Sequence, residues 1–240
     1  MSSEARGTLY LLPNTLGDTA AEAVIPAAAL HRARSLDYFI AENPKSARAF
    51  LKRIGYPRAL QELRIERLDH NTHPRDIPAL LETVLGGRDA GLLSEAGMPA
   101  VADPGAALVR IAHEKGVRVV PMVGPSSIVL ALAASGLEGQ RFAFHGYLPV
   151  KQSELADALK ELERQSQRLN QTQIFIETPY RNDATLGAVL RALRDDTLVC
   201  VAADLTLESE MVRTRRAAAW RREAPQLKGR PAVFLLLASG

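Results

Sequence analysis

Two loop segments carry residues that suit the binding of a polar ligand. Residues 94–105 read Ser-Glu-Ala-Gly-Met-Pro-Ala-Val-Ala-Asp-Pro-Gly, and residues 121–127 read Pro-Met-Val-Gly-Pro-Ser-Ser. Small side chains and Gly97 let the backbone approach a ligand closely. Ser126 and Ser127 open a predicted helix, whose free N–H groups and hydroxyls can hydrogen-bond a polar ligand. Either loop alone is also typical of an ordinary turn between a strand and a helix, whereas the two together favour a binding site.

Several common catalytic motifs are absent from the sequence. It contains no G-x-G-x-x-G after the first strand-like run, no G-x-x-x-x-G-K-[ST], no G-x-S-x-G and no H-E-x-x-H. This argues against a standard dinucleotide oxidoreductase, P-loop NTPase, serine hydrolase or zincin. His70 and His73 have H-x-x-H spacing, but Pro74 follows and no third ligand type is nearby. We therefore interpret this segment as a polar loop and predict no metal site.

The elements that must position these loops alternate along the whole chain. Several strand-like runs are continuously apolar, which is typical of strands covered on both faces. The sequence predicts strands over residues 8–12, 38–41, 90–94, 117–121, 142–147, 173–177, 198–202 and 232–238. It predicts helices over residues 47–55, 75–85, 105–115, 126–135, 154–169, 184–193 and 217–227. This alternation predicts an α/β fold, in which ligands collect beyond the carboxyl ends of strands.

The length suits either one large α/β domain or two smaller ones. The chain has 240 residues, of which 47% are hydrophobic and 24% charged, an ordinary globular composition. A strand end followed by Gly124-Pro125 divides it almost equally. We predict two α/β domains with mostly parallel and mixed sheets, spanning residues 1–121 and 122–240.

Cysteine usage and hydropathy bear on the compartment. Cys200 is the only cysteine, so no internal disulfide forms, and its apolar neighbours predict a buried strand. No run of 18 apolar residues is present, and residues 1–6 are polar and lead directly into a strand-like run. We expect no membrane span, no signal peptide and a cytoplasmic location.

The chain resembles a known family, the tetrapyrrole methylase superfamily of class III S-adenosylmethionine-dependent methyltransferases. Within it, the chain is most similar to the branch that contains the bacterial 16S rRNA cytidine 2′-O-methyltransferase. The two loops at 94–105 and 121–127 carry the resemblance most specifically. Weaker segments follow in order: 12–18, 41–42, 69–71, 147–151, 175–181, 205–206 with Glu210, and 231–232.

The resemblance implies a cofactor cleft between two α/β domains, S-adenosyl-L-methionine as the cofactor and, usually, a homodimer. Residues 97–99, Gly-Met-Pro, stand where the family has Gly-Asp-Pro or Gly-Thr-Pro. Carried over position by position, the cofactor contacts would be Leu12, Gly97, Met98, Pro99, Ser126, Ser127, Glu177, Ala202 and Ala232.

Three departures from the rRNA enzymes concern the acceptor side. They carry Glu-Asp-Thr-Arg where residues 42–45 read Glu-Asn-Pro-Lys, and Arg-Glu-Leu-Thr where residues 203–206 read Ala-Asp-Leu-Thr. They also continue for a small C-terminal segment beyond the position of Gly240. These differences weaken the inference of an rRNA substrate more than that of the cofactor.

The implied reaction is an in-line methyl transfer, in which the protein mainly aligns donor and acceptor and excludes water. A hydroxyl acceptor also needs a base for its proton. The catalytic candidates are Glu42, Lys151, Arg181 and Glu210, with Glu177 a further carboxylate. Lys151 would have to be neutral to act as a base, so we favour substrate orientation or charge stabilisation for it. A solvated surface charge is the alternative for each candidate.

A basic segment bears on the acceptor. Residues 211–230 contain seven Lys or Arg residues and one acidic residue, Glu223, within a chain of net charge +3. Such clustering suits RNA phosphates, so we expect rRNA or the small ribosomal subunit as partner. A solvated helix face or a dimer contact is the alternative interpretation. A small tetrapyrrole-like acceptor and a non-catalytic cofactor-binding module stay open as alternative functions.

Overall fold

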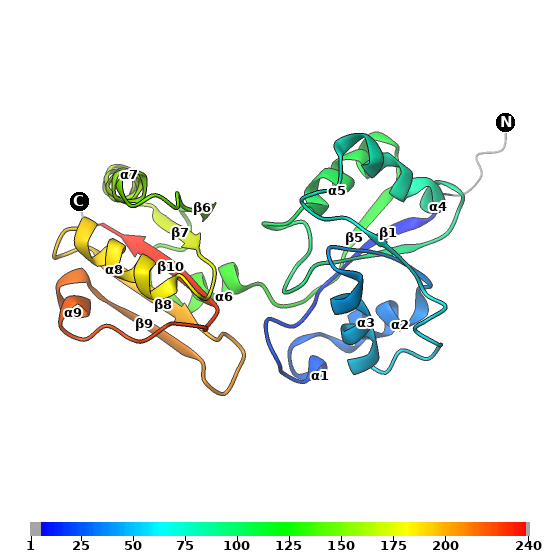
Figure 1. The fold of residues 1–240 in the computed structure, drawn as a ribbon, viewed down its shortest axis with the longest axis horizontal. Helices are drawn as coiled ribbons and strands as arrows, with labels where there is room; N and C mark the ends of the chain where they lie inside the picture. The colour runs from blue at the N-terminus through cyan, green and yellow to red at the C-terminus, as the bar shows by residue number, and fades with distance from the viewer. Residues whose placement is uncertain (1–5, 239–240) are drawn as a thin grey trace. The chain divides into compact units, whose positions relative to one another are not determined.

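The computed structural model describes residues 6–238, so the polar residues 1–5, on which the expected lack of a signal peptide partly rests, lie outside it. The chain divides into two compact units, Met1–Ser126 and Ser127–Gly240 (Figure 1). Among residues 6–238, no helix is long and apolar enough to cross a membrane.

The N-terminal unit is built on a parallel sheet of order β3-β2-β4-β1-β5. Its strands are β1 (Thr8–Leu12), β2 (Tyr38–Ala41), β3 (Arg64–Arg67), β4 (Ala90–Leu93) and β5 (Arg118–Pro121). Helices α1 (Ala21–Val24), α2 (Ala27–Ser35) and α3 (Pro44–Arg53) cover one face. The 3-10 helix η1 (Pro74–Leu81), α4 (Glu82–Leu85) and α5 (Gly105–Glu114) cover the other, as Figure 1 shows for α4 and α5. Burial on both faces explains the continuous apolar runs of β2 and β4.

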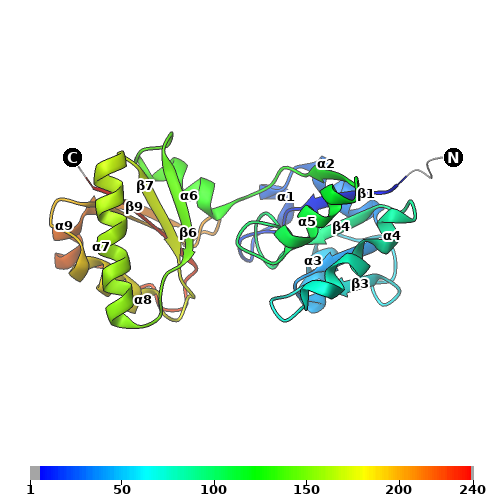
Figure 2. The same cartoon turned by 90° about the horizontal axis from the view of Figure 1, so that it is seen from above.

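The C-terminal unit is built on a mixed sheet of order β6-β7-β10-β8-β9. Strands β6 (Phe142–Tyr147) and β7 (Thr172–Ile176) pair in parallel, whereas β8 (Leu198–Ala203), β9 (Met211–Arg216) and β10 (Ala232–Leu237) pair antiparallel. The helices are α6 (Ser127–Ser135), α7 (Gln152–Leu169), α8 (Asn182–Ala192) and α9 (Ala217–Arg222). Helix α7 packs against β7 and β10. Figure 2 shows α7 beside β7. The fold class predicted from the sequence, α/β with mostly parallel and mixed sheets, is therefore confirmed: one sheet is parallel and the other is mixed.

The core of the C-terminal unit is apolar with a few polar anchors. The rings of Phe175 and Phe234 stack with centroids 5.5 Å apart, and the buried Trp220 donates through Nε1 to the Val199 carbonyl at 2.8 Å. Cys200 is fully buried in β8, as its neighbours predicted.

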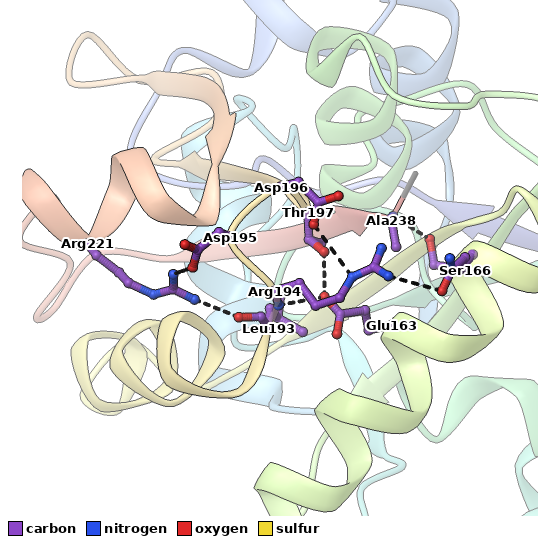
Figure 3. A network of polar contacts seen from close by, with 10 residues as sticks. Glu163, Ser166, Leu193, Arg194, Asp195, Asp196, Thr197, Arg221 and Ala238 are labelled. Carbon is purple, nitrogen blue, oxygen red and sulfur yellow. Dashed lines mark hydrogen bonds and ion pairs between the residues drawn. The ribbon is translucent and has the colours of Figure 1, made fainter. Parts of the chain in front are cut away.

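A polar network closes the amino-terminal end of β8 (Figure 3). The buried Glu163 of α7 accepts from the Arg194 backbone N–H at 2.9 Å and from the Thr197 hydroxyl. Arg221 of α9 donates to the Leu193 carbonyl at 2.6 Å and pairs with Asp195. These bonds satisfy buried polar groups where helices and loops meet, which is a structural role.

The structure corrects several predicted elements. Strands β3 and β9 and helices α1 and α2 lie where the sequence predicted none. The helix predicted over 75–85 is a 3-10 helix over Pro74–Leu81, because Pro78 lacks the N–H that an α-helix needs, followed by one turn of α-helix.

Candidate functional site

The predicted residues of the N-terminal unit lie at one edge of its sheet. All its strands run parallel, so their carboxyl ends share that edge. Leu12 ends β1, Glu42 follows β2, and the Gly97-Met98-Pro99 turn follows β4. Ser126 closes the loop after β5. The unit therefore gathers these positions where open α/β sheets bind ligands.

The loops after β1 and β4 are joined by hydrogen bonds. The buried Asn14 donates from its backbone N–H to the Gly97 carbonyl at 2.9 Å. Its side-chain amide donates to the carbonyls of Ser94 at 3.2 Å and Glu95 at 3.0 Å. Asn14 thus fixes the path of the β4 loop. No motif in the sequence singled this residue out.

Two glycines let the loop after β5 pack closely against the loops after β1 and β4. Gly97 has φ of +68°, and a Cβ there would lie 3.2 Å from Leu16 Cδ2 and 3.4 Å from the Pro125 carbonyl oxygen. A Cβ on Gly124 would lie 2.1 Å from the Pro13 Cβ, an impossible contact. Glycine is required at position 124 because the Pro13 ring occupies the space of a side chain, and it is favoured at position 97 by the left-handed backbone.

The β4 loop also stores backbone strain. Ala100 and Ala102 adopt left-handed conformations, with φ of 66° and 62°. The Asp103 carboxylate braces this turn by accepting from the Ala100 N–H at 2.9 Å and from the N–H of Gly105, the first residue of α5, at 2.7 Å. Burial raises the pKa of Asp103 despite these hydrogen bonds. Strained residues that the surroundings hold in place are typical of binding loops.

Glu42 occupies an environment suited to proton transfer. Its backbone N–H donates to the Leu93 carbonyl at 3.3 Å, which places it beside the β4 loop. Burial raises the pKa of its carboxyl, and the negative charges of Glu95 and Asp103 raise it further. Glu95 is itself held by the Asn43 side chain at 3.2 Å. A carboxyl with a raised pKa is a stronger base than an ordinary one, as catalysis near neutral pH requires.

The predicted residues of the C-terminal unit also share a sheet edge. In the strand register, Val233 of β10 pairs with Ile176 of β7 and with Ala202 of β8. Ala202 lies in this row, Glu177 follows Ile176, and Ala232 precedes Val233. Lys151 lies in the loop after β6, and Arg181 lies just before α8. Glu210 lies just before β9, and Ser127 is the first residue of α6.

The charged residues at this edge are already engaged. Arg181 Nε lies 3.3 Å from Glu177 Oε2, and the Glu177 side chain is only 8% exposed. Lys151 Nζ lies 3.0 Å from Glu154 at the start of α7. The Glu210 carboxylate accepts from the Thr206 backbone N–H at 2.7 Å. These partners make the four side chains better suited to orienting groups than to removing a proton.

The structure divides the basic segment into two groups. Arg215 lies 2.9 Å from Glu223 and over the Trp220 ring, Arg221 pairs with Asp195, and Arg230 pairs with Asp204. These three arginines are engaged by partners within the unit. The other four basic residues of the segment are exposed: Arg213, Arg216, Arg222 and Lys228.

Comparison with known proteins agrees with the architecture. The family model for "Tetrapyrrole (Corrin/Porphyrin) Methylases" matches residues 20–219. The crystal structure of the methyltransferase CobJ superposes with a TM-score of 0.63 at 16% identity, covering 97% of this chain and 94% of that one, which shows a shared fold.

Closer relatives carry the name ribosomal RNA small subunit methyltransferase I. The protein from Escherichia coli O157:H7 is 33% identical over 88% of this chain and 70% of its own length. The protein from Mesorhizobium japonicum is 35% identical over 86% of this chain and 66% of its own length. The chain thus spans about two thirds of the length of these relatives. It belongs to the tetrapyrrole methylase family, whose members use S-adenosylmethionine as methyl donor.

Proposed function

We propose that this chain transfers a methyl group from S-adenosylmethionine to a ribose hydroxyl of small-subunit ribosomal RNA. The observation that carries the proposal is the similarity to small-subunit rRNA methyltransferases, at 33–35% identity over 86–88% of the chain. An enzyme with this substrate works where ribosomes are, so we also propose a cytoplasmic location. The homodimer implied by the family resemblance is part of the same proposal.

The residues at the two sheet edges fit this cofactor. The loops of the N-terminal unit offer backbone groups beside small side chains, and Gly97 keeps the approach open. In the C-terminal unit, Thr206 Oγ1 is buried without a hydrogen-bond partner among the described residues, which suits a polar ligand. When bound, the cofactor supplies a methyl group already activated by its sulfonium. The proposed contacts are Leu12, Gly97, Met98, Pro99 and Ser126 in one unit, and Ser127, Glu177, Ala202 and Ala232 in the other.

Glu42 is the residue we propose as general base. A ribose hydroxyl must lose its proton as its oxygen attacks the methyl group, and the proton passes to the base. The raised pKa of Glu42 suits that task. Arg181, Lys151 and Glu210 are held by ion pairs or by a backbone N–H, so we assign them to orienting the acceptor and balancing charge.

The exposed basic residues of the segment 211–230 are the proposed contacts for RNA phosphates. Arg213 and Arg216 lie on β9, at the edge of the mixed sheet, whereas Arg222 and Lys228 follow along the chain. Phosphate contacts of this kind give affinity that falls with salt, by about 0.7–0.9 in log–log slope for each neutralised charge.

Transfer of labelled methyl tests the proposal. Small ribosomal subunits that lack this family's modification should accept label, with the labelled position mapped to one ribose. If a tetrapyrrole takes up label and the ribosomal subunits do not, the acceptor is a small molecule. The replacement of the rRNA enzymes' Asp-Thr-Arg by Asn43-Pro44-Lys45 favours that alternative. Calorimetric binding of S-adenosylhomocysteine without label in any cellular fraction would indicate a non-catalytic module. Tight NAD binding with no response to S-adenosylhomocysteine would refute the proposal altogether.

A further inference from the structure

The loops at the candidate edge of the C-terminal unit meet at one ion pair. Arg230 Nε donates to Asp204 Oδ2 at 2.7 Å, and Arg230 Nη2 donates to the Ser209 carbonyl at 2.8 Å. The Ser209 hydroxyl donates to the same Asp204 oxygen at 2.9 Å. The Asp204 side chain is 8% exposed and that of Arg230 28%, so water screens this pair less than a surface pair.

The pair holds a strained loop after β8. Asp204 and Thr206 adopt left-handed conformations, with φ of 52° and 73°. For a β-branched threonine this conformation is a clear outlier and persists only where the surroundings enforce it. The Thr206 N–H donates to Glu210, and its hydroxyl oxygen is buried without a partner in the part of the chain that the structure describes. Strain and an unsatisfied hydroxyl coincide on one residue.

The same pair is tied to the neighbouring loop after β7. The Arg230 carbonyl accepts from the Asn182 side chain at 2.6 Å, and the Gly229 N–H donates to the Pro179 carbonyl at 3.0 Å. The Asp204 N–H donates to the Pro231 carbonyl at 2.9 Å, next to Ala232. Hydrogen bonds with the backbone of residues 229–230 therefore join the loop after β7 to that segment, and the side chains of Arg230 and Asp204 join the segment to the loop after β8.

We propose that Asp204 and Arg230 are a positioning pair, which sets the Thr206–Glu210 loop and the Glu177–Arg181 loop in the geometry that binds cofactor and acceptor. The inference rests on the proposed function, because it assumes that this edge is part of the methyl-transfer site. Neither residue has to touch the reacting atoms. Asp204 acts by fixing the left-handed loop, and Arg230 by joining that loop to its neighbours.

The chain offers a matched control at the other end of β8. Arg221 pairs with Asp195 and donates to the Leu193 carbonyl (Figure 3). It also donates to the Leu190 carbonyl, so it too joins separate segments. Asp195 precedes β8 and lies away from the candidate edge, whereas Asp204 follows β8. The Asp195 side chain is 82% exposed, so its charge contributes little to stability, and the Arg221–Asp195 pair is not placed to affect binding.

The experiment compares Asp204→Asn with Asp195→Asn in the full-length protein. Asparagine tolerates the left-handed conformation and keeps the side-chain shape, so the substitution removes mainly the charge. We expect Asp204→Asn to weaken S-adenosylhomocysteine binding and to lower kcat/KM for methyl transfer, each by about tenfold or more, since a charge-assisted hydrogen bond is lost. Asp195→Asn should change either quantity less than about twofold, and circular dichroism melts of both variants show how much stability each charge contributes.

A double-mutant cycle excludes a merely local effect. If the two residues act as a unit, adding Arg230→Gln to Asp204→Asn should cost little further affinity, so the two losses are not additive. Equal losses of affinity in the Asp204 and Asp195 variants would overturn the proposal, as would additive losses. If the wild-type protein binds S-adenosylhomocysteine but methylates no RNA, the proposed acceptor fails while the calorimetric comparison still decides the role of the pair.

Discussion

Replacing Gly97 by valine tests whether the β4 loop is a binding surface or only a turn. Gly97 lies at φ of +68°, between Leu16 and the Pro125 carbonyl. Gly55, which follows α3, has nearly the same φ of +69°, but a Cβ there would meet no atom within 4 Å. A side chain at either position therefore has the same conformational cost in the backbone. Only at Gly97 does the side chain also contact neighbouring atoms.

The structure allows the cost of each change to be estimated. A left-handed conformation costs a residue with a Cβ roughly 1–2 kcal/mol, so Gly55→Ala and Gly97→Ala should lose similar amounts of stability. The Cβ of the Gly97 variant comes within 3.2 Å of Leu16 Cδ2, the end of a flexible side chain, so that contact adds little. Valine adds overpacking of about 1–3 kcal/mol, a total within the roughly 5–15 kcal/mol by which proteins are stable. A folded Gly97→Val protein is thus expected.

Two measurements separate stability from binding. Urea unfolding followed by circular dichroism gives the free energy of unfolding, and calorimetry with S-adenosylhomocysteine gives affinity. We expect Gly97→Val to lose binding below detection, Gly97→Ala to weaken it, and Gly55→Ala to leave it unchanged. If a folded Gly97→Val variant binds as tightly as wild type, the loop is merely a turn and the reasoning is wrong.

Two further predictions use the charged residues. Because burial, Glu95 and Asp103 raise the pKa of Glu42, its ionisation opposes folding, and its contribution to stability is lost as pH rises through that pKa. Glu42→Gln should therefore be more stable than wild type at neutral pH, with a flatter stability-against-pH curve, yet lack methyl transfer; retained activity would remove Glu42 as the base. Arg213→Ala with Arg216→Ala should flatten the salt dependence of RNA binding by roughly 1–2 log–log units and leave S-adenosylhomocysteine binding intact. A slope that does not respond would place the RNA contact elsewhere.

The sequence predicted the interior strands and the edge strands β5 and β6, but it missed the edge strands β3 and β9. Strands β2 and β4 are buried on both faces, so their apolar runs are unbroken and easy to recognise. Strand β3 reads Arg-Ile-Glu-Arg and β9 reads Met-Val-Arg-Thr-Arg-Arg, because both lie at sheet edges, where charged residues discourage pairing with other chains. Because of their polar composition, the sequence predicted no strand at these positions.

The candidate site divides in the same way. Positions such as Glu42 and Gly97 could be placed from the sequence, since a parallel sheet brings the carboxyl ends of its strands to one edge. The Asp204–Arg230 pair could not, because it depends on the antiparallel register of Ala203 with Ala232, which no local pattern encodes. Arginines that stabilise the fold, such as Arg221, look the same in sequence as those free to meet a phosphate.

The single tryptophan of the chain makes unfolding of one unit visible by fluorescence. Trp220 is fully buried, bonded to Val199, and belongs to a core made only of residues from the C-terminal unit. Its emission should therefore be blue-shifted in the native protein and move to the red when that unit opens. An N-terminal unit that unfolds separately would leave the emission unchanged, so a fluorescence transition that differs from the ellipticity transition would reveal a half-folded intermediate.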